Sequence, residues 1–453
     1  MSMEPMPLPP AFLRHTEAIM GTERLARFLE AFCEEPPVSI RLNPQKGMRE
    51  GLVTEIIETR VPWCADGYYL SRRPNFTFDP LLHAGCYYVQ EAASQFVAHC
   101  ADFIVGNLTS RPSLTALDLC AAPGGKSTAL RATLPEDALL VSNEPIRKRA
   151  QILSENMQKW GHTNCIVANN YPRDFMRSGL ADMFDIVLCD VPCSGEGMFR
   201  KDPSAIGEWS EQNVERCWQL QREIVSDIWP CLRPGGVLIY STCTFNTKEN
   251  EENVKWLTEQ LDAEMISIPT LPDWHVCGSL LPGFCAPVYR FIPGVTRSEG
   301  LFVAVLRKKG GDTHSDGKST AKRFAAMASA LSRLNLMHTS FPPVALPGNT
   351  PKAKKNKKQQ DEEMTCTEAL SATLDRSRYN MVELPYDKAI AYLRREAIVL
   401  PEDTPRGIVV VTFKGHPLGV AKNIGSRANN LYPHEWAIKS SHTPTLPPYS
   451  PAT

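Results

Sequence analysis

Two cysteines stand at the ends of predicted buried strands, where a thiol can meet a substrate. Cys193 lies in the segment FDIVLCDVPCSGEG, residues 184–197, and Cys243 lies in GGVLIYSTCT, residues 235–244. Upstream, ALDLCAAPGGK, residues 116–126, predicts a strand that leads into a glycine turn of the kind that holds a cofactor. A cofactor turn with two strand-end thiols is the set of groups needed to put a methyl group on an unreactive pyrimidine carbon.

Such a reaction makes three demands on the side chains. Carbon-5 of cytosine is too electron-poor to take a methyl group directly, so a thiolate must first add to carbon-6 and an acid near ring nitrogen-3 must assist. A base must then remove the carbon-5 proton so that the thiol can leave. The segments Asp190–Cys193 and Ser241–Thr244 supply one acid and two thiols at the carboxyl ends of strands, where open α/β sheets bind ligands.

The competing interpretation is that both cysteines merely fill the core, which is the commonest fate of a free cysteine. We keep this interpretation for Cys120 and Cys189, which lie within apolar predicted strands. Polar and turn-forming neighbours instead favour exposed, positioned thiols at Cys193 and Cys243; these are Pro192, Ser194, Gly195, Gly197, Thr242, Thr244 and Asn246.

The glycine turn favours one cofactor over two others. Gly124 and Gly125 let the backbone bend and approach a ligand, and the helix that follows offers free N–H groups to a carboxylate or phosphate. A P-loop would need glycine where Cys120 stands, and the dinucleotide pattern Gly-x-Gly-x-x-Gly is absent. We therefore expect S-adenosylmethionine, whose carboxylate can use the turn and whose ribose requires an acid at the end of the next strand.

Glu144 is that acid, because it follows the predicted strand 138–143. The alternative is that it is only a helix N-terminal charge favoured by the helix dipole. The expected cofactor contacts, besides one to the adenine, are Cys120, Ala121, Ala122, Pro123, Gly124, Gly125, Lys126, Glu144 and Asp190.

These residues require an α/β scaffold. Between residues 106 and 308, apolar strands alternate with amphipathic helices, which predicts a mostly parallel sheet covered on both faces. A helix over 145–160 illustrates the pattern, with Ile146 and Trp160 at the ends of one apolar stripe. The predicted strands are Thr115–Cys120, Ala138–Asn143, Cys165–Asn169, Asp185–Asp190, Val237–Ser241, Leu301–Arg307 and a weaker one at Met265–Ile268.

Four segments divide the chain. We predict a small N-terminal domain over 1–105, the catalytic domain over 106–308, a linker over 309–375 and a compact module over 376–453. The linker is expected to hold a short helix, Phe324–Leu336, and the polybasic run Lys352–Lys358.

Composition restricts the protein class. The 453 residues are 43% hydrophobic and 22% charged, as in ordinary soluble proteins, and the net charge of −1 means that nucleic acid must be held by a local patch. The 14 cysteines do not suggest a disulfide framework, and no signal segment or membrane-length apolar stretch is present. No cysteine or histidine spacing suits zinc. We expect a cytoplasmic monomer with no metal and no membrane partner.

A basic stretch near the C-terminus predicts an RNA surface. Residues 404–439 carry a local charge of +4, and Tyr432, His434 and Trp436 lie among the basic residues. The alternative is a small domain whose Trp436 is core and whose lysines are merely solvated. Arg200 and Lys201 follow the Cys193 loop and are expected to contact RNA near the target base. The basic residues of the stretch are Arg406, Lys414, Lys422, Arg427 and Lys439, against the acid Glu435.

Three motifs in order, CAAPGGK, DVPCSGEG and STCT, resemble the RNA 5-cytosine methyltransferases of the RsmB/RsmF and Nol/Nop/Sun group. The segment Tyr87–Ser94 resembles the part that precedes the catalytic domain, and Gly415–Gly419 with Asn430–Trp436 resembles the PUA-like end of RsmF/YebU-type rRNA enzymes. The resemblance implies a Rossmann-like S-adenosylmethionine-dependent methyltransferase sheet and a C-terminal PUA-like RNA-binding module.

The resemblance also implies roles for particular residues. Cys243 is the nucleophile and Cys193 aids release, while Asp190 lies beside the cytosine ring and Lys126 lies between cofactor and active site. One position departs from the family pattern, because an aspartate that contacts the adenine is often found where this chain has NNYP, residues 169–172. Asn170, Tyr171 or the later Asp174 takes its place.

The sequence thus predicts an RNA (cytosine-5)-methyltransferase whose partner is RNA, with ribosomal RNA or a ribosomal subunit preferred. Two alternatives stay open: a tRNA enzyme with the same chemistry, and a noncatalytic RNA-binding ribosome assembly factor. The set Cys193, Cys243 and Asp190 speaks against the factor, because a scaffold needs no pair of positioned thiols.

Overall fold

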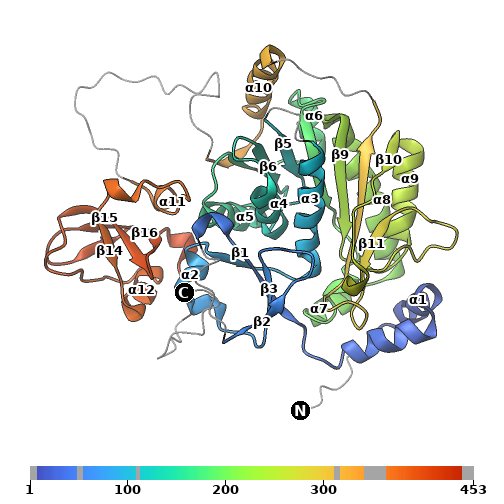
Figure 1. Ribbon diagram of the computed structural model, residues 1–453, viewed down its shortest axis with the longest axis horizontal. Coiled ribbons are helices and arrows are strands. Elements are labelled where there is room, and N and C mark those ends of the chain that lie inside the picture. The colour runs from blue at the N-terminus through green and yellow to red at the C-terminus, as the bar shows by residue number, and fades with distance from the viewer. Residues whose placement is uncertain (1–7, 48–54, 109–112, 311–316, 341–363, 441–453) are drawn as a thin grey trace.

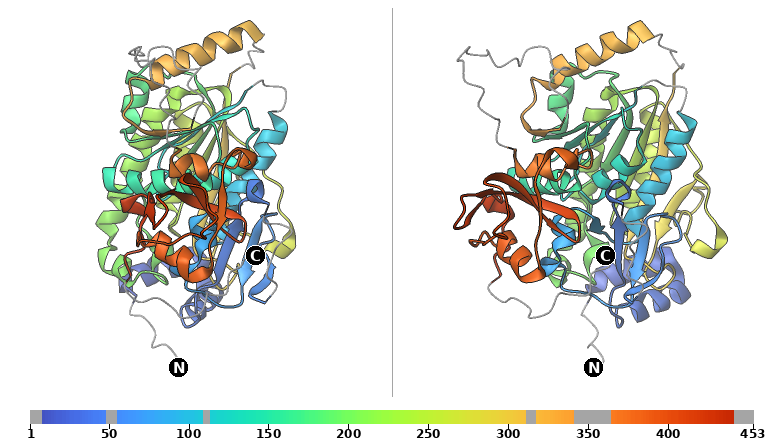
Figure 2. Two further views of the ribbon diagram at one scale, coloured as in Figure 1. Left: turned by 90° about the vertical axis from the view of Figure 1, so that its left-hand side faces the viewer. Right: turned by 60° about the vertical axis from the view of Figure 1, so that its left-hand side comes forward.

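Three β-sheets organise the chain. The computed structural model describes residues 8–47, 55–108, 113–310, 317–340 and 364–440. A large central sheet is accompanied by a smaller N-terminal sheet and by a C-terminal sheet at the left of the molecule (Figure 1). A second view shows the C-terminal module in front of the central sheet (Figure 2).

The central sheet has the order β10-β12-β9-β8-β5-β6-β7-β13, with β11 also paired to β12. Its five middle strands run parallel, as predicted, whereas β10 to β13 pair antiparallel with their neighbours. The strands are β5 (Thr115–Asp118), β6 (Leu139–Asn143), β7 (Cys165–Ala168), β8 (Phe184–Asp190), β9 (Leu232–Thr242), β10 (Ala263–Met265), β11 (Val288–Phe291), β12 (Leu301–Lys308) and β13 (Leu336–Thr339).

Helices cover both faces of this sheet, which confirms the α/β class. Successive residues of β8 face opposite ways: Ile186 and Leu188 pack in one buried cluster, and Val187 and Cys189 in the other. Cys189 is thus a core residue, as predicted. The first face carries α3 (Phe96–Asn107), α4 (Gly125–Thr133) and α5 (Arg147–Trp160); the second carries α6 (Pro172–Arg177), α8 (Glu211–Ile228), α9 (Asn253–Gln260) and α10 (Gly317–Leu331).

The N-terminal part contains a helix and a four-stranded antiparallel sheet. Helix α1 (Pro10–Ala31) is interrupted at Gly21, whose φ of 74° leaves the helical region. Its Phe12 and Phe28 pack against Phe199 and Phe245 of the catalytic region. The sheet, in the order β2-β3-β1-β4, comprises β1 (Val38–Leu42), β2 (Ile57–Arg60), β3 (Gly67–Leu70) and β4 (Tyr87–Val89), and α2 (Pro80–His83) precedes β4.

The C-terminal module shares a core with the N-terminal sheet. One buried cluster contains Ile40 and Tyr87 together with Val411 and Trp436. The buried ammonium of Lys46 donates hydrogen bonds to three carbonyls, those of Ala84, Lys159 and Leu370. The module consists of α11 (Cys366–Ala369), β14 (Met381–Glu383), α12 (Tyr386–Leu393), β15 (Gly407–Phe413), β16 (His416–Asn423) and β17 (Ala428–Asn430).

The segment predicted as a linker contributes to the fold. Its helix, α10, ends at Leu331, and β13 then pairs with β7 at the edge of the central sheet. The apolar Leu334 and Leu336 pack against the sheet beyond the end of α10, so the prediction of a helix that reaches Leu336 is wrong. Helix α11 packs on β16, because the Val420 amide donates to Cys366 Sγ, and the module therefore begins before residue 376. The run 352–358 lies outside the described residues.

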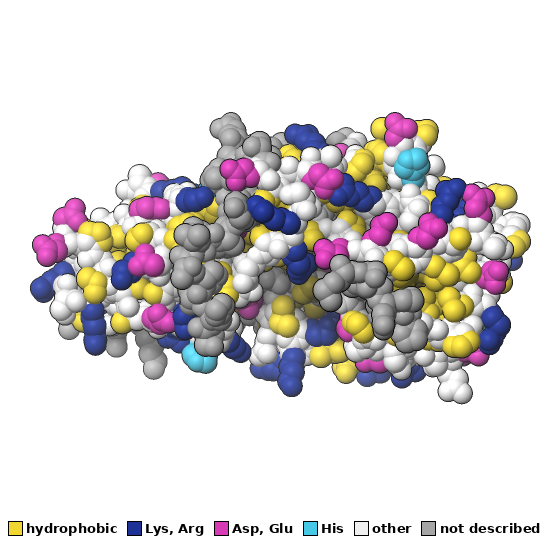
Figure 3. Space-filling model, turned by 90° about the horizontal axis from the view of Figure 1, so that it is seen from below, with side chains coloured by type: hydrophobic (Ala, Val, Ile, Leu, Met, Phe, Trp, Pro, Cys, Tyr) yellow, Lys and Arg dark blue, Asp and Glu magenta, His cyan; other side chains and the backbone are white. Residues whose placement is uncertain are grey.

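The surface is of mixed charge. On the face seen in Figure 3, Lys and Arg side chains are interspersed with Asp and Glu, in keeping with the small net charge. Within the described ranges, no helix is long and apolar enough to cross a membrane. No group of three or more His, Cys, Asp or Glu side chains in the same ranges could hold a metal ion.

Candidate active site

The two thiols meet at the carboxyl edge of the sheet. β8 and β9 are parallel neighbours with Asp190 opposite Ser241, so their ends coincide. Cys193 follows β8 by three residues and Cys243 directly follows β9, which brings the two Sγ atoms to 3.1 Å. Both side chains are partly exposed.

Asp190 lies beside the thiols and joins them to the glycine turn. Its Oδ2 accepts a hydrogen bond from Lys126 Nζ at 2.8 Å, and its Oδ1 accepts one from Ser241 Oγ at 2.8 Å. Lys126 reaches it from the first turn of α4. Burial lowers the pKa of Lys126, but the charge and hydrogen bond of Asp190 outweigh this effect and raise it overall. The lysine is therefore a cation.

The environment of Cys193 favours the protonated thiol. Its contact with Cys243 and its burial raise the pKa of Cys193 well above the ordinary value. Either sulfur can be the donor in their contact, because each thiol carries one S–H.

The glycine turn has the conformation that its residues require. Gly124 precedes α4 with φ at 116°, a region that other residues avoid. The Ala121 amide donates to Asn143, and the carbonyls of Ala122 and Pro123 accept from Arg149 and Asn156. Cys120 lies beyond the end of β5 and is only partly buried, so the prediction that it lies inside a strand is wrong.

A cavity of about 400 Å³ opens beside this turn. Glu144 lies at its wall, and its Oε2 accepts no hydrogen bond from the described residues but lies 3.1 Å from Arg149 Nη1. Burial raises the pKa of Glu144. The cavity is lined by Leu119, Cys120, Glu144, Pro145, Ile146, Arg149, Tyr171, Pro172, Arg173, Pro192, Leu220, Glu223, Ile224 and Asp227.

The cavity fits the adenosine part of S-adenosylmethionine. Ile146, Tyr171 and Leu220 line it, and their side chains are 54%, 59% and 38% exposed. Apolar side chains of this size left open to solvent suit a flat heterocycle, and the carboxylate suits ribose hydroxyls. The prediction that Ile146 belongs to the core stripe of a helix is wrong, because α5 starts one residue later and Ile146 faces the cavity.

The three candidates for the adenine contact lie in different surroundings. Tyr171 lines the cavity. Asn170 instead bonds with Asn335, its side chain both donating to and accepting from that residue's backbone. Asp174 accepts a hydrogen bond from the Tyr171 amide and caps α6.

Several residues expected to contact RNA are engaged elsewhere. Arg200 is buried and lies 3.1 Å from the carboxylate of Glu299, whereas Lys201 is exposed. Tyr432 and Trp436 are buried in the core of the C-terminal module, so neither ring can stack on a base. The alternative interpretation, that Trp436 is a core residue of a small domain, is therefore correct, because a small β-module packs its largest side chains in its core. His434 is exposed.

Sequence reasoning missed the buried polar residues behind the thiols. Glu196 and Glu249 both lie within hydrogen-bond reach of the loops that carry Cys193 and Cys243. Burial, with a further contribution from Glu196, raises the pKa of Glu249 to about 7. The signal that could have found them is an acidic residue close to each thiol in the sequence, three residues after Cys193 and six residues after Cys243.

A parallel sheet with a cofactor turn after its first strand, and an acid after the next, defines a Rossmann-like S-adenosylmethionine-dependent methyltransferase. A methyltransferase homologue from Pyrococcus horikoshii has a similar structure. It superposes with a TM-score of 0.54 and is 25% identical, over 67% of this chain and 96% of that one.

Comparison with known sequences shows to which family of methyltransferases the chain belongs. Family models match residues 106–307 (16S rRNA methyltransferase RsmB/F), 8–92 (N-terminal domain of 16S rRNA methyltransferase RsmF) and 379–438 (methyltransferase RsmF PUA domain). Proteins named ribosomal RNA small subunit methyltransferase F are 32% identical in Citrobacter koseri and 31% in Serratia proteamaculans. Each match covers 94% of this chain and 96% of the relative. The chain belongs to the RsmF family of methyltransferases.

Proposed function

We propose that this protein methylates carbon-5 of a cytosine in RNA, and that its substrate is the RNA of the small ribosomal subunit. The observation that carries the proposal is the pair of thiols with Sγ atoms 3.1 Å apart, beside the Asp190–Lys126 ion pair. The names of the family's curated members support the choice of RNA.

Cys243 is the nucleophile in this proposal. The assignment follows the resemblance of the STCT segment to the family's motif, and the contact with Cys243 and burial raise the pKa of Cys193 well above its ordinary value. Cys243 Sγ forms a bond to carbon-6, and the electron pair of the carbon-5–carbon-6 double bond moves into the ring.

Asp190 assists that addition. The carboxyl group donates a proton toward ring nitrogen-3, and Lys126 Nζ is a proton source at 2.8 Å. Ser241 fixes the other carboxyl oxygen, so the group cannot rotate away. When bound at the glycine turn and the cavity beside Glu144, S-adenosylmethionine supplies an electrophilic methyl group.

Cys193 completes the reaction. Once Cys243 has become a thioether, Cys193 loses its proton to water and then takes the proton from carbon-5. The carbon-5–hydrogen pair re-forms the double bond, the carbon-6–sulfur bond breaks, and its electron pair returns to Cys243 Sγ.

Cofactor binding is expected to depend on Glu144. Its carboxylate can accept ribose hydroxyl bonds worth roughly 1.5–3 kcal/mol each. Glu144→Ala should therefore raise the dissociation constant of S-adenosylmethionine about tenfold or more in titration calorimetry. Glu223→Ala removes an exposed carboxylate from the rim of the same cavity and is the control, expected to bind within about twofold of wild type. Equal affinity of the Glu144 variant and wild type would contradict the assignment.

The basic residues of the C-terminal module divide between two places. Arg406 and Arg427 are exposed at the end of the sheet where Gly407 and Ala428 both pair with Asn423. Lys414 lies at the opposite end, in the hairpin between β15 and β16. The first group is our candidate for a phosphate-binding surface.

Reversing the charge of Arg406 and Arg427 should weaken RNA binding, because the attraction to phosphates is lost. The double variant Arg406→Glu/Arg427→Glu should lower RNA affinity at least tenfold. It should also reduce the slope of log K against log salt by about 2, because two phosphate contacts are lost. Filter binding over a salt series measures both quantities. Lys414→Glu is the control and should change neither; an unaltered slope in the double variant would exclude this surface.

One experiment tests the function and both of its rivals. The purified protein is incubated with methyl-labelled cofactor and with small subunits, free small-subunit rRNA or tRNA, and the product nucleoside is identified by mass spectrometry and bisulfite sequencing. We expect 5-methylcytosine in the ribosomal RNA. Label in tRNA alone would reassign the substrate, label on another base or atom would reject the chemistry, and RNA binding without label would favour an assembly factor.

A further inference from the structure

Two buried carboxylates connect the loops that carry the thiols, and each reaches across to the other loop. Glu196 follows Cys193, and Glu249 follows Cys243 in the short π-helical segment η7 (Lys248–Glu252). Both side chains are almost fully buried. Neither has a part in the chemical steps described above.

Glu249 holds the loop of Cys193. Its Oε2 accepts a hydrogen bond from the Ser194 amide at 3.0 Å and one from Gln221 Nε2 at 2.7 Å. Its Oε1 accepts one from Asn246 Nδ2 at 2.8 Å. The peptide directly after the Cys193 thiol is thereby fixed to the segment that follows Cys243.

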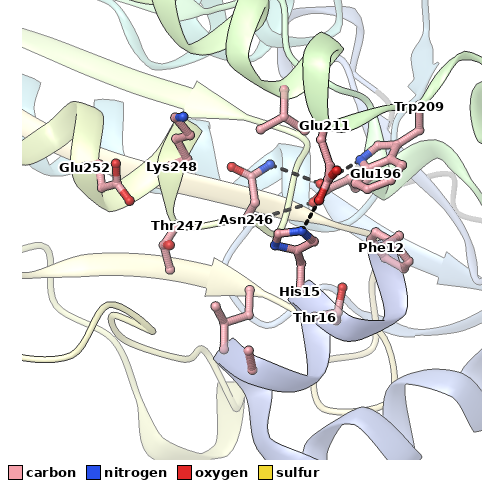
Figure 4. Close-up of a pocket in the computed structure, with 13 residues that line it drawn as sticks. Phe12, His15, Thr16, Glu196, Trp209, Glu211, Asn246, Thr247, Lys248 and Glu252 are labelled. Atoms are coloured by element: carbon pink, nitrogen blue, oxygen red, sulfur yellow. Dashed lines mark hydrogen bonds and ion pairs between the residues drawn. The ribbon is translucent and has the colours of Figure 1, made fainter. Parts of the chain in front are cut away.

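Glu196 holds the loop of Cys243 in the same manner. Its Oε2 accepts from the amides of Phe245 and Asn246 at 2.7 and 3.0 Å. Its Oε1 accepts from Trp209 Nε1 and Asn246 Nδ2, both at 3.0 Å, and Figure 4 shows these groups converging beside α1. The side-chain amide of Asn246 thus donates hydrogen bonds to both carboxylates.

The backbones of the two loops also touch. The Gly197 amide donates to the Cys243 carbonyl at 2.7 Å, and Ser194 Oγ lies 2.9 Å from Thr244 Oγ1. A Cβ at position 197 would lie 2.7 Å from the Cys243 carbonyl oxygen, so only glycine allows this approach. The separation of the thiols is therefore set by the connections between the loops.

We propose that Glu196 and Glu249 are positioning residues for the two thiols, Glu249 acting on Cys193 and Glu196 acting on Cys243. The assignment of separate effects rests on the proposed function. Each carboxylate accepts from donors at both of its oxygens. A glutamine has only one acceptor oxygen, and its other end is an NH₂ donor. In either orientation of the amide this NH₂ group faces an N–H donor, so the substitution of glutamine for glutamate breaks the connection between the two loops.

The two glutamine variants should fail differently. Glu249→Gln displaces Cys193, so proton removal should slow tenfold or more and protein should accumulate covalently attached to RNA. Glu196→Gln displaces Cys243, so adduct formation should slow tenfold or more and no attached protein should accumulate. If a residue only stabilised the fold, its substitution would lower the rates of adduct formation and proton removal together.

Single-turnover kinetics and denaturing gels measure the two steps, with Cys193→Ala run in parallel. Asp185→Asn is the matched control: this buried carboxylate lies at the opposite end of β8 and pairs with Arg233 and Arg323. It should lower the melting temperature without changing the ratio of the two rates. If Cys193→Ala traps RNA and Glu249→Gln does not, the inference is overturned while the proposed function stands.

A second readout is independent of the reaction. Diamide removes one hydrogen from each thiol and joins the sulfurs, which lowers the protein mass by about 2 Da. Wild type without RNA or cofactor should form the Cys193–Cys243 disulfide at least fivefold faster than either glutamine variant. Wild-type crosslinking rates in both variants would reject the inference whatever the RNA assays show. If a glutamine variant fails to fold, Asn246→Ala takes its place. It removes the side-chain amide that bonds to both carboxylates and leaves both glutamates unchanged. This variant should also form the disulfide more slowly than wild type.

Discussion

Replacing Cys243 by alanine is expected to abolish methylation and to leave no protein covalently attached to RNA. Without Cys243 Sγ no bond to carbon-6 forms, and Cys193 does not substitute because its burial still raises the pKa of its thiol. The loss of methyl transfer should exceed about 10³-fold, as for other nucleophiles that act within a catalytic unit. Incorporation of labelled methyl groups into RNA measures it.

Replacing Cys193 by alanine is expected to give the opposite failure. Addition and methyl transfer proceed once, but no group takes the carbon-5 proton, so the carbon-6–sulfur bond persists. Protein attached to RNA should accumulate as a slow band on a denaturing gel and disappear on treatment with ribonuclease. Turnover should fall by about 10²–10⁴-fold, the usual contribution of a general base.

Cys189→Ala is the control for both variants, because Cys189 lies in β8, four residues before Cys193, but is packed in the core. It should change stability and not the appearance of the attached protein. If Cys243→Ala traps RNA and Cys193→Ala does not, the two roles are reversed. If neither variant changes methylation, the covalent mechanism is wrong.

The thiols were predictable because a parallel sheet sends the ends of its strands to one edge. Short apolar runs that end in polar, turn-forming residues mark those ends, and so the sequence is enough to bring Asp190, Cys193 and Cys243 together. The glycine turn and Glu144 follow from the same rule. What the rule does not give is the distance between the thiols, or which of them keeps its proton.

Other features depend on long-range packing that no local pattern encodes. Leu334 and Leu336 were expected in the helix that begins before them, but the chain turns after Leu331 and β13 completes the sheet edge. Arg200 carries the charge expected of an RNA contact, yet Glu299, almost a hundred residues later, pairs with it. Leu220 enters the cofactor cavity from α8, a helix with no motif.

The C-terminal module shows how composition misleads when burial is unknown. A cluster of basic and aromatic residues suggested stacking on bases, but Tyr432 and Trp436 form the core shared with the N-terminal sheet. Four of the five basic residues are exposed, because a charged side chain loses its hydration when buried; they are Arg406, Lys414, Arg427 and Lys439. The exposure of the basic residues could therefore be predicted from the sequence, whereas the burial of the Tyr432 and Trp436 rings could not.

The second large effect is expected at Asp190, whose carboxyl group joins the chemistry to the cofactor turn. In Asp190→Asn an amide faces Lys126 and Ser241, and it can neither donate an acidic proton toward ring nitrogen-3 nor form an ion pair with the lysine. We expect kcat to fall by about 10²–10⁴-fold, with the adduct and the product declining together, because addition itself is slowed. The affinity for S-adenosylmethionine should change by only a few fold.

Variants of the two hydrogen-bond partners of Asp190 distinguish the supply of a proton by Lys126 from the orientation of the carboxyl group by Ser241. Ser241→Ala removes one hydrogen bond to Asp190 and should cost about tenfold, consistent with a bond to a charged group. Lys126→Met should approach the loss seen in Asp190→Asn, and the double variant should be little worse than either, since residues that act as one unit are not additive. If the two losses instead multiply, Lys126 serves the cofactor alone and the proton at nitrogen-3 comes from another source. If Asp190→Asn retains wild-type kcat, the carboxyl group does not assist the addition.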